Sequence, residues 1–276
     1  MNPRALLKSY GLRARKHLGQ NFLSDENIAR KIAKAAVPKD GTVLEIGPGL
    51  GALTRPLCAR AKQVIAVEID SLMVEILKSE LADVDNLKIV SKDILKCDLS
   101  KLLSEFESTE NLCACGNLPY YITTPILFLL IEAKPEIQAL TLMMQREVGA
   151  RLQAKPNTKD YNALSVLLQL QFDIETVAKV PASCFYPAPQ VDSLVLQLRR
   201  KPGVILDPDF AAFVKQCFKQ RRKTLRNNLN LNAQQCEHLY AKTKIKPEER
   251  AESLTLQQFE RLYQEVRHES QSLREN

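Results

Sequence analysis

From residue 42 onward, short apolar runs alternate with stretches that repeat their apolar positions at helical spacing. This alternation is typical of a strand, helix, strand order, which builds a parallel sheet with helices on both faces. Sheets of this kind bind ligands beyond the carboxyl ends of their strands. The predicted strands lie at 42–46, 63–69, 87–91, 111–117 and 137–145, and the predicted helices at 51–61, 71–81 and 125–133.

The flanks of this central section follow other patterns. Ser24 is predicted to cap a helix whose apolar positions, Ile28 and Ile32 among them, recur at helical spacing. Late in the chain, alternating runs at 173–180 and 191–200 surround a Pro-rich segment. We expect these runs to add two strands to the sheet in an antiparallel, hairpin-like way.

Sheet-like patterning stops at "RRKPGVILDP", where Pro and Gly interrupt the chain, and the residues that follow have helical patterns. A chain of 276 residues that is 45% hydrophobic can bury one full core and a small second one. We therefore predict two domains, a larger one at 1–203 that contains the sheet and a helical one at 204–276.

The net charge of +7 is concentrated near the two ends of the chain. Residues 1–31 contain seven Lys and Arg against two Asp and Glu, and residues 200–250 contain twelve against five. The section between them is mildly acidic. This distribution favours a polyanionic partner, above all a nucleic acid, over a small anionic metabolite, and a generally basic surface is the simpler alternative.

Nothing in the sequence suggests secretion or a membrane. The basic N-terminus lacks the apolar block of a signal peptide, and no run approaches 18 consecutive apolar residues. The seven cysteines include no C-x-x-C pair and are expected to be reduced and buried, so we predict no metal site. A cytoplasmic protein is the expected class.

A glycine loop follows the first strand of the central section, in "VLEIGPGLGALT". Gly47, Gly49 and Gly51 allow a tight turn and the close approach of a ligand at the start of a helix. Their G-x-G-x-G spacing differs from the G-x-G-x-x-G of dinucleotide-binding proteins. Glu68 ends the second strand, where a carboxylate can accept hydrogen bonds from ribose hydroxyls, and Asp93 follows the third strand within reach of an adenine amino group.

Each of these residues is a weak signal when taken alone, because strand-to-helix turns often contain glycine and loop carboxylates are usually solvated. Their occurrence in order, at the ends of three consecutive predicted strands, indicates a nucleoside site. S-adenosylmethionine fits this site better than NAD does, because its amino-acid end needs no phosphate-binding loop.

The fourth strand ends in "GNLPYYITTP". Asn117-Leu118-Pro119-Tyr120 is similar to the [DNS]-P-P-[YF] motif of methyltransferases that act on adenine N6, and "EIGPGLG" and "VEID" match the cofactor motifs of the same enzymes. With "LGQNFL", "FYPAPQVDS", "KQRRKTLRNNL" and "RAESL", the chain resembles the small-subunit ribosomal RNA adenine dimethyltransferases over nearly its whole length.

The resemblance implies a fold, a reaction and a partner. The fold is the Rossmann-like α/β fold of class I S-adenosylmethionine-dependent methyltransferases, a mostly parallel seven-stranded sheet whose last strand is antiparallel, followed by a small helical domain that helps to select the RNA. The reaction is the N6,N6-dimethylation of two adjacent adenosines in a hairpin loop near the 3′ end of small-subunit (16S) ribosomal RNA, in a pre-30S or 30S particle. The enzyme is expected to be a monomer and to assist small-subunit biogenesis.

The exocyclic amine of adenine is a poor nucleophile, because its lone pair is delocalised into the ring. The side-chain oxygen of Asn117 and the carbonyl of Leu118 are expected to accept its hydrogen bonds and to direct the lone pair at the methyl group. Pro119 fixes the turn, Tyr120 stacks on the base and Tyr121 is assigned to packing. Positioning supplies much of the catalysis, so no general base is predicted. The alternative is a capped strand end with a structural tyrosine.

Because the target nitrogen is inaccessible in a stacked base, the enzyme must take an exposed or flipped adenine from the RNA. The resemblance implies that Phe185, in the Pro-rich loop, contacts the opposite face of this base; the alternative is a loop aromatic that fills the core. By the same resemblance, the segment "GQNFL" closes over the cofactor, with Asn21 and Leu23 as contacts.

The helical region is predicted to begin at Asp207 with an amphipathic helix. Its polar face repeats cations at i, i+4, i+7 and i+11 without acidic residues, which favours phosphate contact over a merely solvated face. Arg221 falls on the apolar side, so either it pairs with a buried acid or the helix bends there. A last helix is predicted from Thr255, with Gln258 completing a capping box. The four cations are Lys215, Lys219, Arg222 and Arg226.

Three other functions compete with this interpretation. The nearest is the same chemistry on another nucleic acid, either large-subunit ribosomal RNA, where methylation gives antibiotic resistance, or DNA; "KQRRKTLRNNL" and "RAESL" favour the small-subunit family. A non-catalytic ribosome-assembly factor is opposed by the intact glycine loop and by Glu68, Asp93 and Asn117. A NAD-dependent oxidoreductase is the most distant alternative.

Overall fold

The structure is a computed structural model, and it describes residues 2–15, 18–38, 41–119 and 121–272. The chain forms two compact units, called here the sheet unit and the helical unit. Their division differs from the predicted one at 203/204, because residues 150–172 pack with the C-terminal helices. The sheet unit is Met1–Gly149 with Asp173–Arg200, and the helical unit is Ala150–Phe172 with Lys201–Asn276.

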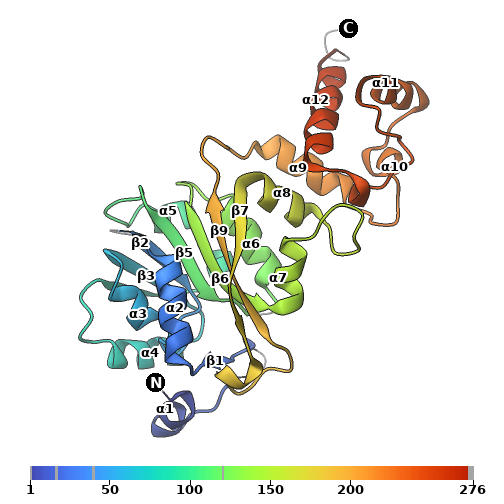
Figure 1. The fold of residues 1–276 in the computed structure, drawn as a ribbon. Coiled ribbons are helices and arrows are strands. Elements are labelled where there is room, and N and C mark those ends of the chain that lie inside the picture. The colour runs from blue at the N-terminus through green and yellow to red at the C-terminus, as the bar shows by residue number, and fades with distance from the viewer. Residues whose placement is uncertain (1, 16–17, 39–40, 120, 273–276) are drawn as a thin grey trace. The chain divides into compact units, whose positions relative to one another are not determined.

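The sheet unit is built on a seven-stranded sheet in the order β4-β3-β2-β5-β6-β9-β7 (Figure 1). The strands β4, β3, β2, β5 and β6 are parallel to their neighbours, whereas β9 is antiparallel to β6. The predicted mostly parallel sheet with an antiparallel last strand is therefore confirmed. The strands are β2 (Thr42–Ile46), β3 (Gln63–Glu68), β4 (Leu87–Ser91), β5 (Leu112–Asn117), β6 (Ala139–Gln145), β7 (Phe172–Val180) and β9 (Ser193–Arg200).

Helices pack on both faces of this sheet (Figure 1). The first of them to contact the sheet, α2, is capped by Asp25, whose side chain accepts hydrogen bonds from the N–H groups of Asn27 and Ile28. The prediction that Ser24 caps this helix is wrong, because the Ser24 hydroxyl donates to the Cys184 carbonyl at 2.9 Å instead. The helices of this part of the chain are α2 (Glu26–Ala36), α3 (Thr54–Cys58), α4 (Ser71–Glu80), α5 (Leu99–Leu103), α6 (Thr123–Ile131) and α7 (Arg146–Leu152).

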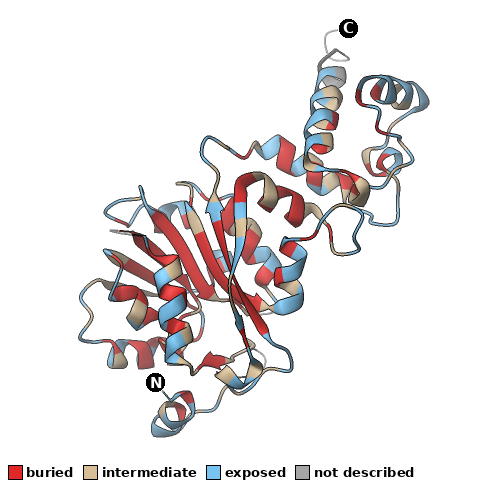
Figure 2. Cartoon of the chain, viewed as in Figure 1, coloured by how far each residue is buried: buried red, intermediate tan, exposed pale blue. Residues whose placement is uncertain are grey.

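The central strands lie in the core, as the buried colour along them in Figure 2 shows. All five residues of β2 are buried, which is expected where a parallel sheet is covered on both faces. Gly116, opposite Ile46 in the register of β5 and β2, has no room for a side chain. A Cβ at Gly116 would lie 2.5 Å from the Ile46 carbonyl oxygen. The two central strands therefore end close together.

A second, two-stranded sheet joins the N-terminal segment to the Pro-rich loop. Its strands are β1 (Phe22–Leu23) and β8 (Phe185–Tyr186), which pair antiparallel with Leu23 opposite Phe185. Before it, the short helix α1 (Pro3–Ser9) places Leu7 in a buried cluster with Phe22 and Met73. The N-terminal segment is thus packed against the sheet unit at several points.

The helical unit contains an aromatic core. The rings of Tyr161 and Phe218 have centroids 6.1 Å apart, and those of Phe218 and Phe259 are 5.7 Å apart. The predicted capping box of the last helix is confirmed, since Thr255 and Gln258 exchange side-chain to backbone hydrogen bonds of 2.8 and 3.3 Å. The helices are α8 (Ala163–Gln171), α9 (Pro208–Cys217), α10 (Leu225–Leu229), α11 (Ala233–Thr243) and α12 (Leu256–Ser272).

Candidate active site

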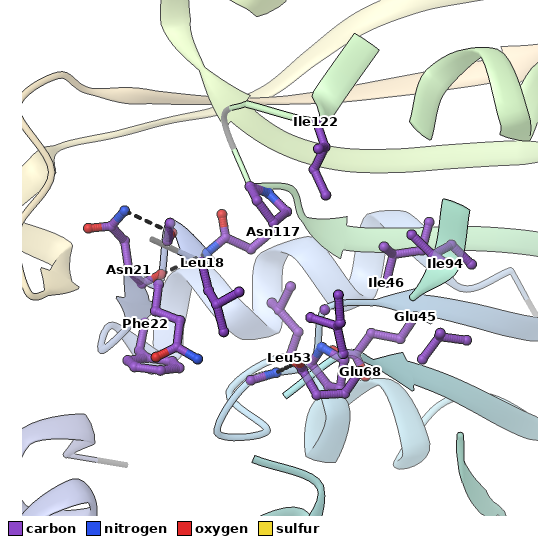
Figure 3. Close-up of a pocket in the computed structure, with 18 of the residues that line it drawn as sticks. Leu18, Asn21, Phe22, Glu45, Ile46, Leu53, Glu68, Ile94, Asn117 and Ile122 are labelled. Atoms are coloured by element: carbon purple, nitrogen blue, oxygen red, sulfur yellow. Dashed lines mark hydrogen bonds between the residues drawn. The ribbon is translucent and has the colours of Figure 1, made fainter. Parts of the chain in front are cut away.

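Four predicted site residues lie at the carboxyl ends of four neighbouring strands. Gly47 follows β2, Glu68 ends β3, Asp93 follows β4 and Asn117 ends β5. Because these strands are parallel, the residues meet at one edge of the sheet, where they line a pocket (Figure 3). All seven residues predicted to bind the cofactor line it: Asn21, Leu23, Gly47, Gly49, Glu68, Asp93 and Asn117.

The glycine loop has a backbone that other residues adopt only with strain. Gly47, Gly49 and Gly51 have φ angles of +66°, +58° and +83°. A Cβ at Gly49 would lie 3.0 Å from the ring of Phe22, so the N-terminal segment packs directly on the loop. A Cβ at Gly47 would meet only the Asn117 carbonyl oxygen, at 3.9 Å, which leaves room for a ligand beside the backbone.

Glu68 connects the glycine loop to the start of α4. Its two carboxylate oxygens accept hydrogen bonds from the N–H groups of Gly49, at 3.0 Å, and Asp70, at 2.9 Å. Burial raises the pKa of Glu68, and the hydrogen bonds from the backbone of Asp70 and Gly49 oppose that rise. Each oxygen has a further lone pair, so the carboxylate can also accept from the hydroxyls of a ribose.

Glu45, in the middle of the buried strand β2, also lines the pocket and was not predicted as a site residue. The residue is 1% exposed, and its Oε2 has no hydrogen-bond partner among the described residues. Burial raises the pKa of Glu45 to about 8, and the charge of Glu68 adds to the rise. A carboxyl group inside an otherwise apolar strand was the available signal in the sequence.

These features fit S-adenosylmethionine. The orphaned Glu45 oxygen matches the ammonium group of its amino-acid end, and the open side of Gly47 accommodates that end without a phosphate-binding loop. Ile69 and Ile94, which also line the pocket, would supply apolar surface to the adenine ring. The carboxyl groups and apolar side chains at these strand ends thus suit a nucleoside with a positive charge.

Asn117 is oriented by the N-terminal segment. Its Nδ2 donates to the backbone carbonyl of Asn21 at 2.9 Å, and the two residues lie side by side in Figure 3. This bond engages the donor side of the Asn117 amide and turns its acceptor, Oδ1, away from Asn21. The amide is therefore arranged so that Oδ1 can accept a hydrogen bond from an amine in the pocket.

The turn after Asn117 is held by backbone hydrogen bonds. The Leu118 N–H donates to the Met143 carbonyl on β6 at 2.9 Å, and the buried Leu118 side chain anchors the turn in the core. The carbonyl of Pro119 accepts from the Thr123 hydroxyl at 3.0 Å, at the start of α6. Tyr120, the predicted stacking residue, lies outside the described residues.

The N-terminal segment is fastened beside the pocket through Asp70, which is 2% exposed. Gln20 donates to Asp70 Oδ2 at 2.9 Å, and Arg15 forms an ion pair with Oδ1 at 3.2 Å. The same carboxylate caps α4 by accepting from the Leu72 N–H. One buried side chain thus links the segment that contains Asn21 to the helix that follows Glu68.

Asp93 is half-buried at the beginning of a short 3₁₀ helix, Ile94–Lys96. Its Oδ1 accepts a hydrogen bond from the Leu95 N–H at 3.0 Å, which fixes the position of the side chain. The carboxylate keeps its other oxygen for a ligand, and Asp93 lines the pocket as predicted.

Two aromatic residues lie where they were not expected. Phe185 was predicted to contact the target base, but the residue is 5% exposed and packs in the core cluster with Leu23, as the alternative interpretation proposed. Tyr121 was assigned to packing, but it is 59% exposed and lines the pocket. The pairing of β1 with β8 buries Phe185, whereas Tyr121 lies in the turn before α6.

The predicted stripe of four cations is not carried by one helix. α9 ends at Cys217 and α10 begins at Leu225, so the basic residues between them lie on a loop. Arg221 was predicted either to pair with a buried acid or to lie at a bend in the helix. It forms an ion pair with the partly buried Glu252 at 3.3 Å within the helical unit, and it also lies where the helical pattern is interrupted. The predicted RNA contacts, all exposed, are Lys215 on α9, Lys219 and Arg222 on the loop, and Arg226 on α10.

Asn228 shapes this basic loop, which we define as residues 218–223. Its side chain is buried and donates to the carbonyls of Gln220 and Lys223 at 3.2 and 3.4 Å, and it accepts from the Gln220 N–H at 3.0 Å. The Gln216 amide donates to the Asn228 carbonyl at 2.6 Å. The Asn228 side chain therefore connects the two ends of the basic loop, and it was not predicted as a site residue.

Metal sites and membrane-spanning helices can be assessed over the described residues. No group of three or more His, Cys, Asp or Glu side chains in them is arranged to hold a metal ion. None of their helices is both long enough and apolar enough to cross a membrane.

Comparisons with known proteins agree with this geometry. Two bacterial relatives called ribosomal RNA small subunit methyltransferase A are similar over nearly the whole chain. The one from Bacillus cytotoxicus (strain DSM 22905 / CIP 110041 / 391-98 / NVH 391-98) is 43% identical over 92% of this chain and 91% of its own length. The one from Geobacillus sp. (strain WCH70) is 42% identical over 96% of both chains.

Solved structures are similar as well. A dimethyladenosine transferase from Plasmodium falciparum has a TM-score of 0.73 and 27% identity, over 90% of this chain and 98% of the other. The 23S rRNA methyltransferase ErmE has a TM-score of 0.66 and 29% identity, over 89% of this chain and 99% of the other. Residues 11–268 match the family Ribosomal RNA adenine dimethylase. The chain thus belongs to the ribosomal RNA adenine dimethylase family, enzymes that use S-adenosylmethionine to methylate adenine in ribosomal RNA.

Proposed function

We propose that this chain dimethylates N6 of two adjacent adenosines in a hairpin loop near the 3′ end of 16S ribosomal RNA. Its substrate would be a 30S or pre-30S particle in the cytoplasm, and the enzyme would act as a monomer and contribute to small-subunit biogenesis. One observation carries the proposal: Asn117, at the end of β5, is aligned by Asn21 beside a pocket lined by the glycine loop and Glu68.

The cofactor would be held by three carboxylates and the glycine loop. S-adenosylmethionine supplies a methyl group that is already activated by a positively charged sulfur. Glu68 would accept hydrogen bonds from the ribose hydroxyls and Asp93 from the adenine amino group, while Glu45 would face the ammonium group. Asn21 and Leu23 would cover the bound molecule from the N-terminal segment.

The target amine would be held by the turn after β5. In the first transfer, the Oδ1 of Asn117 and the carbonyl of Leu118 would accept the two N6 hydrogens, which directs the nitrogen lone pair toward the methyl group. In the second transfer, one N6 hydrogen remains for these two acceptors. Pro119 keeps the turn in shape, and Tyr120 stacks on the target base. The bound S-adenosylmethionine would supply the methyl group, and the amine would release one proton to water, so no basic side chain is needed.

The basic residues of the helical unit would contact the RNA backbone. Lys215, Lys219, Arg222 and Arg226 are exposed cations, and phosphate contacts of this kind position RNA without reading its sequence.

Methyl transfer to defined substrates tests the proposal. We expect label from radioactive S-adenosylmethionine to enter undermethylated small subunits, up to four methyl groups for each particle, and mapping to place it on two adjacent adenosines near the 3′ end. Large subunits, naked ribosomal RNA and DNA serve as competing substrates. Label that enters only one of these three would refute the proposed target.

Substitution of Asn117 separates an enzyme from an assembly factor without catalytic activity. Asn117→Ala should bind small subunits normally but lose methyl transfer, because the amine is no longer aligned. The matched control is Asn111→Ala, an exposed residue just before the opposite end of β5, which should keep full activity. Unchanged turnover in Asn117→Ala would contradict the role given to this amide.

A further inference from the structure

Tyr121 is a large aromatic residue at the rim of the pocket. It is 59% exposed, and it lies four residues after Asn117, in the turn before α6. A Cβ at Gly19 would lie 3.5 Å from the Tyr121 ring and 3.7 Å from Pro119, so one edge of the ring adjoins the N-terminal segment. The rest of the ring is open to solvent beside the place where a substrate would enter.

A single exposed aromatic residue needs no explanation on most surfaces, so the position of Tyr121 is what matters. Among the described residues, Ile69 is the other large apolar residue that both lines this pocket and is more than half exposed. Ile69 follows Glu68 and belongs to the cofactor end, whereas Tyr121 follows Asn117 and belongs to the end where the target amine is held. The exposed part of the Tyr121 ring is therefore placed to contact the substrate.

We propose that Tyr121 stacks on the base that neighbours the target adenine. This inference rests on the proposed function. The target base must enter the pocket to reach Asn117, so the adjoining nucleotide stays at the rim, where its base has lost a stacking partner. Single-stranded RNA is held in this way, by bases that stack on exposed aromatic rings.

The position also suits a substrate with two neighbouring targets. When one adenosine is in the pocket, the other is the flanking base, and the two exchange roles between the two modifications. A stacking surface at the rim is insensitive to methyl groups already present on N6, because it contacts the face of the ring rather than its edge. Tyr121 would therefore support binding at both stages.

Three variants test this role: Tyr121→Phe keeps the aromatic face, Tyr121→Leu keeps apolar bulk without it, and Tyr121→Ala removes both. We expect Leu and Ala to raise KM for undermethylated small subunits roughly tenfold or more, and Phe to leave it within about twofold. The affinity for S-adenosylhomocysteine should stay unchanged in all three. If Tyr121 only packed against Gly19, Tyr121→Phe and Tyr121→Leu would have the same KM, and Tyr121→Ala would bind S-adenosylhomocysteine more weakly. That result would overturn the inference.

A direct readout uses an RNA hairpin with 2-aminopurine at the flanking position. Stacking on Tyr121 should quench its fluorescence on binding to the wild type and to Tyr121→Phe, but not to Tyr121→Leu. Equal quenching by all three proteins would overturn the inference even if they methylate small subunits normally. A wild-type protein that methylates no small subunits would instead refute the proposed function, so the two failures are distinguishable.

Discussion

Replacing Glu45 by glutamine should remove a large pH dependence from the stability of the sheet unit. The pKa of Glu45 is raised to about 8 from an ordinary value of 4.5, mainly by burial. Above pH 4.5 the unfolded chain ionises this group while the folded chain keeps its proton, so folding takes up one proton. Its contribution to stability is therefore complete below pH 4.5 and is lost as the pH rises to 8.

The size of this effect follows from the shift. One proton corresponds to a slope of about 1.4 kcal/mol for each pH unit, and the full interval gives on the order of 5 kcal/mol. Glu45→Gln has the same shape and cannot ionise, so it should be more stable than the wild type at pH 7.5 by roughly 2–4 kcal/mol, less the cost of burying an amide without partners. At pH 5 the two proteins should be nearly equal.

Urea unfolding at several pH values between 5 and 8.5 measures the difference directly. Glu75→Gln, which changes an exposed carboxyl group on α4, is the matched control and should run parallel to the wild type. The reasoning is refuted if the free energies of unfolding of Glu45→Gln and wild type change in parallel with pH. Glu45→Gln should also weaken binding of S-adenosylhomocysteine, because the amide, unlike the carboxyl group, cannot release a proton and become negatively charged beside the ammonium group.

Two further substitutions have controls within the chain. In Gly49→Ala, a left-handed backbone is combined with a Cβ 3.0 Å from Phe22, so the variant should lose roughly 2–4 kcal/mol of stability and bind the cofactor more weakly. Its control is Gly11→Ala, where φ is +68° and a Cβ would have no atom within 4 Å, so the loss should be only about 1–2 kcal/mol. Equal shifts in melting temperature for the two variants would contradict the packing argument. Asn228→Ala removes three hydrogen bonds made by a buried side chain, so it should destabilise the helical unit by about 2–3 kcal/mol and flatten the salt dependence of RNA binding. The exposed Asn227→Ala should do neither, and an unchanged salt dependence in Asn228→Ala would show that the basic loop makes no phosphate contacts.

The strands and the strand-end residues were predictable because their signals are local. Each strand is a short apolar run, and in a parallel sheet the residue after such a run must lie at the carboxyl edge. Gly47, Glu68 and Asn117 therefore came together as expected. The family motifs predicted the fold class and the reaction for the same reason, since they lie at these turns.

The errors concern residues whose surroundings come from distant parts of the chain. Phe185 is buried because β8 pairs with β1, which places it opposite Leu23, a residue 162 positions earlier in the chain. No periodicity in the sequence indicates this pairing. The expected long helix after Asp207 stops because Asn228 forms hydrogen bonds with the loop that replaces it. Glu45 was overlooked because an acidic residue within an apolar strand has no partner in the sequence to suggest its role.

The bond from Asn117 to the carbonyl of Asn21 spans 96 positions of the chain. A fragment that begins after Leu23 would keep all seven strands of the main sheet, the glycine loop and Glu68. It would nevertheless lack the group that orients the amide. The active site is therefore not a property of the sheet alone, and grafting these strand ends onto another scaffold would transfer a nucleoside site without its alignment for methyl transfer.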